Sequence, residues 1–413
     1  MKKILVIPSL KPNEKLPALL REIIAAGYIS SVQSGVITGS DEVEARESDT
    51  EKEISTVVMN SEVTENNRDL KGIMDAILIV DDGSGPDYAS FFEECKSLGC
   101  TVLTHEVNKG KGAALKYAAS YIMETYGWDC GMITADADGQ HRPHDIARVA
   151  RDMEAHPEAL ILGTRELKKE NTPKKSWWGN RCTSIFFRLT CGKWVPDTQT
   201  GLRGIPPLLM PLSATEEGDR YEYEMNILMD ASLDVPFHMT IIDTVYEDDN
   251  KGSHFRPLRD GVRVYGRFIK FLLSSVTGFF VDIILFSVLI AALPAAVDAW
   301  SEYLPAVLQA TATGAASAGR IVTAAFVARI CSGIVNFLFN KYVTFNSKER
   351  SSSEAVKYFI LFVCQMMASA FFTSLFNKVL NAATGAKIIV DLILFFISYR
   401  IQRVWVFRKK IMA

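Results

Sequence analysis

The C-terminal part of the chain contains four long apolar runs, and these limit its possible folds more than any other feature. Each run is long enough to cross the roughly 30 Å hydrocarbon core of a bilayer as a helix. A buried core helix of a soluble protein is the alternative for one run, but four in succession favour membrane spans. We therefore predict a membrane domain over residues 261–413 with four transmembrane helices, at Phe268–Leu293, Ala318–Asn340, Tyr358–Phe376 and Lys387–Phe407.

The basic residues around these runs predict how the spans are oriented. Lys and Arg cluster before the first span, between the second and third spans, and after the fourth, whereas the loop at 294–319 has none. Because cytoplasmic loops carry the excess of Lys and Arg, both termini and the N-terminal part should face the cytoplasm. A charge near a span's centre is costly, so Asp282 and Arg329, at similar depth in the first two spans, are expected to pair. Asp391 in the fourth span is a further candidate partner.

Composition narrows the class of protein and its cellular location. The chain has 413 residues and a formal net charge of -3, which argues against nucleic acid as its main partner. Its seven cysteines include no C-x-x-C pair, so neither a zinc site nor a disulfide framework is indicated, and a reducing cytoplasm fits.

The first 260 residues alternate between strand-like and helical patterns. This alternation predicts an α/β domain with a doubly wound, mostly parallel sheet over 1–260. An acidic, Ser/Thr-rich segment at about 31–71 interrupts the alternation, and we interpret it as an inserted surface excursion. The expected strands are Lys3–Ile7, Ala76–Val80, Thr101–His105, Gly131–Thr134 and Leu160–Gly163, and the expected helices are Lys15–Ala26, Pro86–Leu98, Gly112–Tyr126 and Pro143–Ala155.

The segment GMITADADGQH, residues 131–141, places two aspartates directly after an expected strand. Asp136 and Asp138 should point to the same side of an extended chain, where their charges repel unless a cation lies between them. A solvated acidic turn is the alternative for a D-x-D motif alone. Asp81 and Asp82 also follow a strand, and ligands of such sheets bind at the carboxyl ends of the strands. Both acidic pairs are therefore expected to line one crevice.

Two further segments indicate ligand or membrane contacts. NKGKGAALK, from Asn108, places two Gly and two Lys at a helix start, where phosphate can bind; an ordinary Gly-rich cap is the alternative. The run Lys174–Val195 mixes Trp177, Trp178, Phe186, Phe187 and Trp194 with basic residues. This composition favours a helix in the membrane interface, with a core helix of the soluble domain as the alternative.

Taken in order, several short blocks resemble glycosyltransferase family 2, whose members have a GT-A fold. They are most similar to the polyprenyl-phosphate and dolichyl-phosphate hexose synthases. The blocks are IPSLKPNEKLPAL, VDDGSG, NKGKGAALK, DADGQH, LGTR, PDTQTGLRGIP, DRYEYEMNIL and GSHFRPLRDGVRVYGRFIKF. The resemblance covers roughly Lys2–Lys270 apart from the insert, and the set is far more specific than any one block.

This resemblance implies a role for particular residues. Asp136, Asp138 and Gln140 would hold a divalent cation, Mg²⁺ or Mn²⁺, which suits oxygen ligands. Arg165 and Arg181 would act with the two aspartates in catalysis. The donor nucleotide would be bound by Pro8, Asp81, Asp82, Lys111 and Asp136, and the acceptor phosphate by Arg165, Arg181, Ser184, Arg203 and Arg256.

The membrane half resembles the GtrA-like membrane domain, which has four spans. RICSGIVNFLFNKYVTF, from Arg329, and KIIVDLILFFISYRIQRVWVF, from Lys387, carry this similarity. The two segments end alike, which suggests a duplicated two-span unit of the kind known in transporters.

Together these features predict a multi-pass membrane enzyme that transfers a hexose, with inversion, to a polyprenyl phosphate such as undecaprenyl phosphate. UDP-glucose is the favoured nucleotide-sugar donor, and the membrane half is expected to anchor the enzyme or to aid translocation of the product. A processive polysaccharide synthase is one alternative, but the Q-x-x-R-W motif of that class is missing. A lipid-linked sugar transporter with a relict transferase domain is the other. A homo-oligomer is left open.

Overall fold

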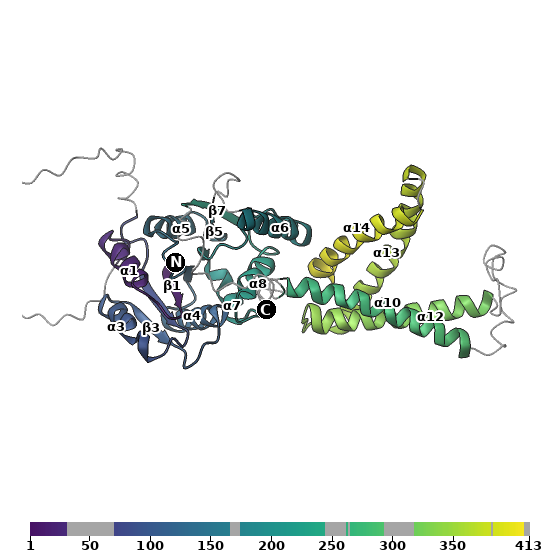
Figure 1. The fold of residues 1–413 in the computed structure, drawn as a ribbon, viewed down its shortest axis with the longest axis horizontal. Coiled ribbons are helices and arrows are strands. Elements are labelled where there is room, and N and C mark those ends of the chain that lie inside the picture. The colour runs from purple at the N-terminus through teal and green to yellow at the C-terminus, as the bar shows by residue number, and fades with distance from the viewer. Residues whose placement is uncertain are drawn as a thin grey trace, which may run out of the picture. The chain divides into compact units, whose positions relative to one another are not determined.

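The computed structural model describes residues 1–30, 70–165, 174–243, 262, 265–292, 318–380 and 383–408. The chain divides into two compact units (Figure 1). The first comprises Met1–Arg188 with Lys193–Phe255, and the second comprises Leu189–Gly192 with Arg256–Ala413. Arg256, most of the predicted excursion at 31–71 and nearly all of the loop at 294–319 lie outside the described residues.

The first unit is built on a seven-stranded sheet with the order β3-β2-β1-β4-β6-β5-β7. All strands are parallel except β6, which runs antiparallel between β4 and β5. This arrangement confirms the predicted mostly parallel α/β sheet. The strands are β1 Lys2–Ser9, β2 Ala76–Asp81, β3 Thr101–Thr104, β4 Cys130–Thr134, β5 Leu160–Arg165, β6 Arg203–Ile205 and β7 Phe237–Ile242. The last two were not predicted.

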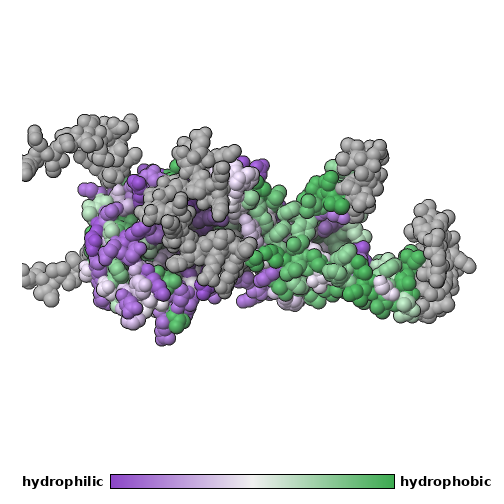
Figure 2. Space-filling view, in the orientation of Figure 1, coloured by the Kyte–Doolittle hydropathy of each residue, from purple (hydrophilic) through white to green (hydrophobic). Residues whose placement is uncertain are grey.

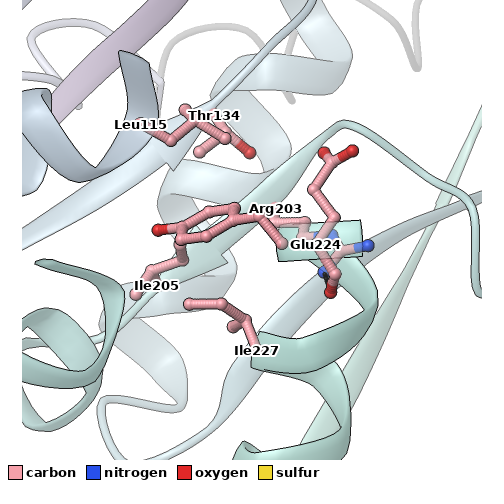
Figure 3. Close-up of a pocket in the computed structure, with 7 residues that line it drawn as sticks. Leu115, Thr134, Arg203, Ile205, Glu224 and Ile227 are labelled. Atoms are coloured by element: carbon pink, nitrogen blue, oxygen red, sulfur yellow. Dashed lines mark hydrogen bonds between the residues drawn. The ribbon is translucent and has the colours of Figure 1, made fainter. Parts of the chain in front are cut away.

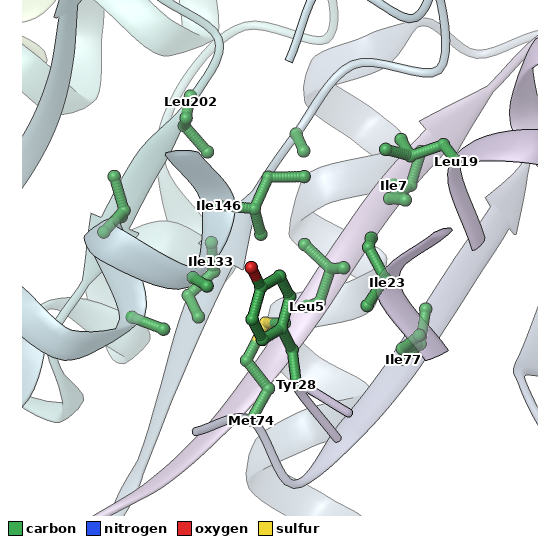
Figure 4. Packing of buried hydrophobic residues seen from close by; sticks show 14 of the residues in the cluster. Leu5, Ile7, Leu19, Ile23, Tyr28, Met74, Ile77, Ile133, Ile146 and Leu202 are labelled. Carbon is green, nitrogen blue, oxygen red and sulfur yellow. The ribbon is translucent and has the colours of Figure 1, made fainter. Parts of the chain in front are cut away.

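Helices cover both faces of the sheet, which explains the unbroken apolar runs of its central strands. Leu5 and Ile7 of β1 belong to a core formed with α1, α3 and α5 (Figure 4). The alternate residues Ile4 and Val6 are equally buried, and α4 contacts β1 and its neighbours. These helices are α1 Lys15–Ala25, α3 Ala89–Ser97 after the 3₁₀ turn Pro86–Tyr88, α4 Lys111–Tyr126 and α5 Pro143–Ala155. All four match predicted helices.

The described residues on either side of the acidic segment lie next to each other. Ile29 and Met74 form a parallel bridge, and the Met74 main-chain N–H donates to the carbonyl of Tyr28 at 3.0 Å. The Gly72 N–H donates to the carbonyl of Gly27 at 2.8 Å. The two described ends of this segment therefore lie side by side, and β1 pairs directly with β2.

Helix α6, Lys174–Cys191, covers the run predicted to lie in the membrane interface. Its inner face is built from Asn180, Thr183, Ser184 and Phe187, all buried. The outer face exposes Trp178, whose side chain is 61% accessible, and Arg181 is exposed on the same helix. The helix is therefore anchored in the first unit by one side and presents an aromatic and basic surface on the other.

The described part of the second unit contains four long helices, and each overlaps one predicted span. They are α10 Gly266–Ala292, α12 Ala318–Phe339, α13 Ser351–Leu380 and α14 Ala383–Ile401. The surface of these helices is largely apolar (Figure 2). Among the described residues, two helical stretches, Gly266–Ala292 and Ile321–Thr344, are long and apolar enough to cross a membrane. The helical C-terminal part is confirmed, while the number of four spans stays a prediction.

The two similar sequence segments form similar local structures. α12 continues into a π-helical segment, η5 Asn340–Thr344, and α14 into another, η6 Gln402–Val406. The Asn340 amide donates to the Gln402 side-chain oxygen at 3.1 Å, so equivalent positions of the two segments bind each other. The rings of Phe345 and Phe407, which end the two segments, stack with centroids 5.1 Å apart. These contacts agree with the predicted duplication.

A buried ion pair lies beside η5. The Lys341 ammonium pairs with the Glu354 carboxylate, and the two side chains are 2% and 4% accessible. Lys341 also donates to the carbonyl of Glu349 at 2.7 Å, and Ser347 donates to Glu354. Breaking a buried pair is costly because the remaining charge keeps no partner.

We expect Lys341→Met to lower the free energy of unfolding by about 3–5 kcal/mol, because Glu354 would remain charged and buried. The double variant Lys341→Met/Glu354→Gln should show a clearly smaller decrease in the free energy of unfolding. Unfolding curves of the full chain in detergent measure both values. A single variant that is no less stable than the double would contradict the importance of the pair.

Candidate active site

The chemistry-bearing residues of the first unit gather at the carboxyl edge of the sheet. β1, β2, β4 and β5 are mutually parallel, so their C-terminal ends lie at the same edge. Asp81 ends β2 opposite Ser9 of β1, and the D-x-D segment follows β4 on the other side of β1. The predicted meeting of the two acidic pairs at one edge is therefore what the strand order produces.

Asp136 is held by a cationic side chain. The Lys111 ammonium lies 2.6 Å from Asp136 Oδ1 and 3.0 Å from Glu224 Oε1. Burial alone would raise the pKa of Asp136, but the charge and hydrogen bond of Lys111, together with the His141 and Arg165 charges, lower the pKa to about 2. A Cβ atom at Gly201 would collide with the Asp136 carboxylate, so only glycine leaves room for it there. Asp136 is thus ionised and packed against Gly201, while its side chain stays 32% accessible.

Asp138 is exposed, and it differs from Asp136 in its electrostatics. Crowding by the surrounding protein and the negative charge of Asp136 raise the pKa of the Asp138 carboxyl. Its Oδ1 accepts the Gln140 main-chain N–H at 3.0 Å, and the Asp136 N–H donates to His141 Nδ1 at 3.0 Å. Hydrogen bonds within the loop therefore fix its shape. The carboxylates of Asp136 and Asp138, which are separated by one residue, repel each other.

This donor set fits a divalent cation. Carboxylate oxygens are the ligands that Mg²⁺ and Mn²⁺ prefer, and a cation between the two groups would remove the repulsion that raises the Asp138 pKa. The Lys111 ammonium at Asp136 Oδ1 demonstrates that positive charge is stabilised at this point. Asp136 and Asp138 are accordingly the residues that could hold the ion, and Gln140 lies beside them, half-buried.

The main-chain N–H groups at the NKGKG helix start bind a side chain of the same domain. Asp82 is buried, and its carboxylate accepts the main-chain N–H groups of Lys109 at 3.0 Å and Gly110 at 2.7 Å. His105 Nδ1 lies 2.8 Å from the same carboxylate. These N–H groups are therefore engaged by Asp82, which corrects the expectation that this loop offers them to phosphate. Asp82 thus has a structural task, and its nucleotide contact stays a prediction.

The residues predicted at the start of the donor site lie together. The Ser84 N–H donates to Asp81 Oδ1 at 2.9 Å, and the Lys11 N–H donates to Ser84 Oγ at 2.8 Å. Pro8 is half-buried in β1, opposite Val80 of β2. The first block of the sequence is thus joined to the DDGSG turn through main-chain contacts.

The arginines predicted to bind the acceptor phosphate differ in their surroundings. Arg165 donates to the buried Asp197 carboxylate from both Nε, at 2.7 Å, and Nη2, at 3.2 Å. The Arg181 guanidinium stacks over the Trp194 ring at 4.9 Å. Both groups are therefore oriented by a specific partner, and Arg181 remains exposed.

Two other predicted acceptor residues lie inside the fold. The Arg203 guanidinium is 3% accessible and donates to the carbonyl oxygens of Thr198, Thr200 and Glu224. Ser184 is buried and donates to the carbonyl of Pro196 at 3.2 Å. Their polar groups bind main-chain carbonyls of the first unit, and their contact with the acceptor phosphate stays a prediction.

Glu224 and Asp197 were missed by the sequence-based assignment. Both lie in blocks of the family resemblance, DRYEYEMNIL and PDTQTGLRGIP, but they stand far in sequence from the residues they contact. Glu224 projects from the first turn of α8, Glu222–Ala231, beside Arg203 at a narrow pocket between β4, β6 and α8 (Figure 3).

A second group of possible metal ligands lies at the start of α5 and the end of β7. His144, Asp145 and Asp243 each offer one ligand atom, all within 4.8 Å of one another. His144 Nε2 lies 3.3 Å from Asp243 Oδ2, and Arg148 approaches Asp145 at 3.4 Å. Because these groups already pair among themselves and with Arg148, the D-x-D pair is the stronger candidate for a cation.

Comparison with known proteins assigns both parts of the chain. Residues 62–205 match glycosyl transferase family 2, and residues 270–407 match the GtrA/DPMS transmembrane domain. The chain is 32% identical over 166 residues to a UDP-N-acetylglucosamine--dolichyl-phosphate N-acetylglucosaminyltransferase from Methanococcus voltae, covering 36% of this chain and 65% of that protein. It is also 32% identical over 161 residues to an uncharacterised protein from Methanocaldococcus jannaschii, covering 37% and 63%.

The chain thus spans just under two thirds of the length of these two relatives. Among solved structures, mannosyl-3-phosphoglycerate synthase from Rubrobacter xylanophilus aligns with a TM-score of 0.41 and 15% identity, covering 64% of this chain and 70% of that one. The two family matches agree with the two compact units in order along the chain. The chain therefore joins a segment that matches glycosyl transferase family 2 to a segment that matches the GtrA/DPMS transmembrane domain.

Proposed function

We propose that this enzyme transfers a hexose from a nucleotide sugar to the phosphate of a polyprenol at the cytoplasmic face of the membrane. The observation that carries the proposal is the D-x-D pair at the carboxyl edge of a family 2 domain that is fused to a membrane domain. UDP-glucose is the favoured donor. The name of the Methanococcus voltae relative states a UDP-sugar donor and a dolichyl-phosphate acceptor. It supports a UDP-sugar and a prenyl phosphate here, and makes N-acetylglucosamine the second candidate sugar.

The reaction needs positioning more than a strong base. A phosphate monoester has its second pKa near 6, so the acceptor is largely dianionic at neutral pH and can attack the anomeric carbon directly. The new bond joins the acceptor oxygen to that carbon, while the bond from the carbon to the diphosphate breaks and the nucleoside diphosphate leaves with the electron pair. Attack from the opposite face inverts the anomeric configuration. A cation at Asp136 and Asp138 would neutralise charge on the leaving diphosphate.

The acceptor side is supported by the surface of α6. Two anions must approach each other in this reaction, so fixed cations have to hold the acceptor phosphate. Arg181 lies on the exposed face with Trp178, and such aromatic and basic surfaces favour the headgroup region of a bilayer. Arg165 has its guanidinium already oriented by Asp197, which reduces the entropy lost on binding.

The membrane domain is proposed to anchor the enzyme with both termini in the cytoplasm and to aid translocation of the lipid-linked sugar. The distribution of Lys and Arg supports the orientation. Translocation is supported by the duplicated helical segments and by the polar pair Asp282–Arg329 within the apolar helices.

A direct test is to incubate membranes containing the chain with labelled UDP-glucose, UDP-N-acetylglucosamine or GDP-mannose, then extract the lipid. We expect label in an acid-labile prenyl-phosphate sugar from one donor, and none from membranes without the chain. Label that enters a polymer and not a lipid would favour the processive synthase. No transfer from any nucleotide sugar would favour a transporter.

We expect Arg181→Ala to raise the KM for polyprenyl phosphate about tenfold or more, because a charge-assisted contact to phosphate contributes roughly 1.5–3 kcal/mol. Donor binding should stay near normal, since Arg181 stacks over Trp194 and is proposed to bind the acceptor phosphate. Steady-state kinetics with each substrate varied in turn separates the two effects. Arg188→Ala on the same helix is the matched control, and a collapse of donor affinity in Arg181→Ala would reverse the assignment.

A further inference from the structure

Lys111 lies between two carboxylates, of which only one belongs to the candidate cation site. Its ammonium contacts Asp136 Oδ1 at 2.6 Å and Glu224 Oε1 at 3.0 Å. Asp136 belongs to the pair that could hold a divalent cation, whereas Glu224 comes from α8 and lies outside the D-x-D segment. One cationic side chain is therefore shared by a candidate metal ligand and a residue that the D-x-D motif does not include.

A divalent cation on Asp136 would conflict with Lys111 as it stands. The ion and the ammonium would claim the same carboxylate and would repel each other at close range. The ammonium therefore has to move when the cation binds, and the cost of that move depends on where it can go.

The main chain of Glu224 is held where its side chain can bind the Lys111 ammonium. α4 begins directly against the segment before α8: the Ala113 N–H donates to the Asp219 carbonyl at 3.1 Å, and a Cβ atom at Gly112 would collide with Tyr223. Arg203 donates to the Glu224 carbonyl at 2.6 Å. These contacts fix the Glu224 main chain beside Lys111, whose flexible four-carbon stem allows a short shift.

One oxygen of the Glu224 carboxylate can still accept a hydrogen bond. Its Oε1 atom is buried and, among the described residues, accepts no well-aligned hydrogen bond although Lys111 lies 3.0 Å away. A buried carboxylate oxygen in this state gains from closer contact with a cation. Movement of Lys111 away from Asp136 would therefore be partly offset by a better bond to Glu224.

We propose that Glu224 is a positioning residue that takes over Lys111 when a divalent cation binds Asp136 and Asp138, and so sets the affinity of the site for the cation. The inference rests on the proposed cation site but adds a residue that does not touch the ion. Its signature is that the effect of Glu224 on cation binding depends entirely on Lys111.

The test is a double-mutant cycle on Mn²⁺ binding to the purified full chain in detergent, with free Mn²⁺ measured by electron paramagnetic resonance and no nucleotide added. We expect Glu224→Gln to weaken Mn²⁺ binding about tenfold, because Lys111 would then stay on Asp136. Lys111→Met should tighten binding by a similar factor. In the Lys111→Met background, Glu224→Gln should change the affinity less than about twofold.

Each outcome decides between specific alternatives. If Glu224→Gln weakens binding equally in both backgrounds, Glu224 is a direct ligand and the inference is overturned; it is also overturned if neither single variant changes the affinity. If the parent chain binds no Mn²⁺, or if Asp138→Asn binds it as well as the parent, the cation site itself fails. Glu222→Gln, the same charge change two residues earlier in α8, and Glu224→Asp, which keeps the charge, control for altered folding.

Discussion

Asp138→Asn is expected to reduce sugar transfer by at least about 100-fold, the scale seen when one group that stabilises transition-state charge is removed. The leaving diphosphate accumulates negative charge, and the cation that would neutralise it needs both carboxylates. Asp138 gives a cleaner test than Asp136, because Asp136 also binds Lys111 and is enclosed by Gly201. Transfer of label from nucleotide sugar to extracted lipid measures the effect.

The same change should leave the fold intact. The negative charge of Asp136 helps to raise the pKa of Asp138, so removing the Asp138 charge relieves a repulsion and should not lower the unfolding temperature. Asp87→Asn, an exposed aspartate of the same unit, is the matched control and should transfer normally. Excess EDTA should abolish transfer by the parent chain and by the control alike. Full turnover in EDTA would rule out the cation.

The alternating pattern of the first unit was sufficient to predict five strands and four helices, because apolar residues recur in them with the period of a strand or a helix. β6 escaped prediction for a physical reason. It has only three residues, Arg203–Ile205, with glycine inside it and prolines directly after it, which are turn signals. Only its two neighbours, β4 and β5, make it a strand, so its pairing depends on tertiary structure.

The candidate site was predictable in its acidic residues and not in the groups that control them. The sequence identifies Asp136 and Asp138 because two like charges directly follow a strand. Lys111 reaches Asp136 only because α4 crosses the face of β1, β2 and β4. The structural role of Asp82 was not predicted, because the partners of its carboxylate, the N–H groups of the NKGKG loop, come from a separate motif. Local patterns identify charged groups, whereas topology decides which of them remain available.

In the membrane unit, sequence alone indicated the duplication and the structure adds its physical basis. Asn340 donates to the Asn336 side chain four residues earlier at 2.7 Å, and Gln402 donates in the same way to Ser398 at 3.2 Å. Asn336 also accepts from Ser274 of α10 and Tyr358 of α13. These bonds continue along α12 toward Ser332, which donates to Asp282 at 3.3 Å. One side of α12 is thus lined by polar groups that bind one another.

The predicted pair of Asp282 and Arg329 forms: Arg329 Nη2 lies 3.4 Å from Asp282 Oδ2. A lone charge near the centre of a bilayer costs about 2.5–3.5 kcal/mol on insertion scales, so removing either partner alone should destabilise the second unit. Asp282→Asn and Arg329→Gln should each strongly reduce the appearance of lipid-linked sugar on the outer face of sealed vesicles. Synthesis on the cytoplasmic face should continue, because the D-x-D site lies in the first unit.

The double variant Asp282→Asn/Arg329→Gln separates a structural pair from a functional one. It contains no unpaired charge, so it should recover the stability that each single variant loses. If the pair only fixes α10 to α12, export should recover with stability. If Arg329 meets the anionic phosphate of the lipid during its movement, export should remain low in a fully folded protein, because neutral side chains cannot stabilise that charge in an apolar environment. Equal loss of synthesis in both single variants, or unchanged export in all three, would limit the membrane unit to anchoring the enzyme.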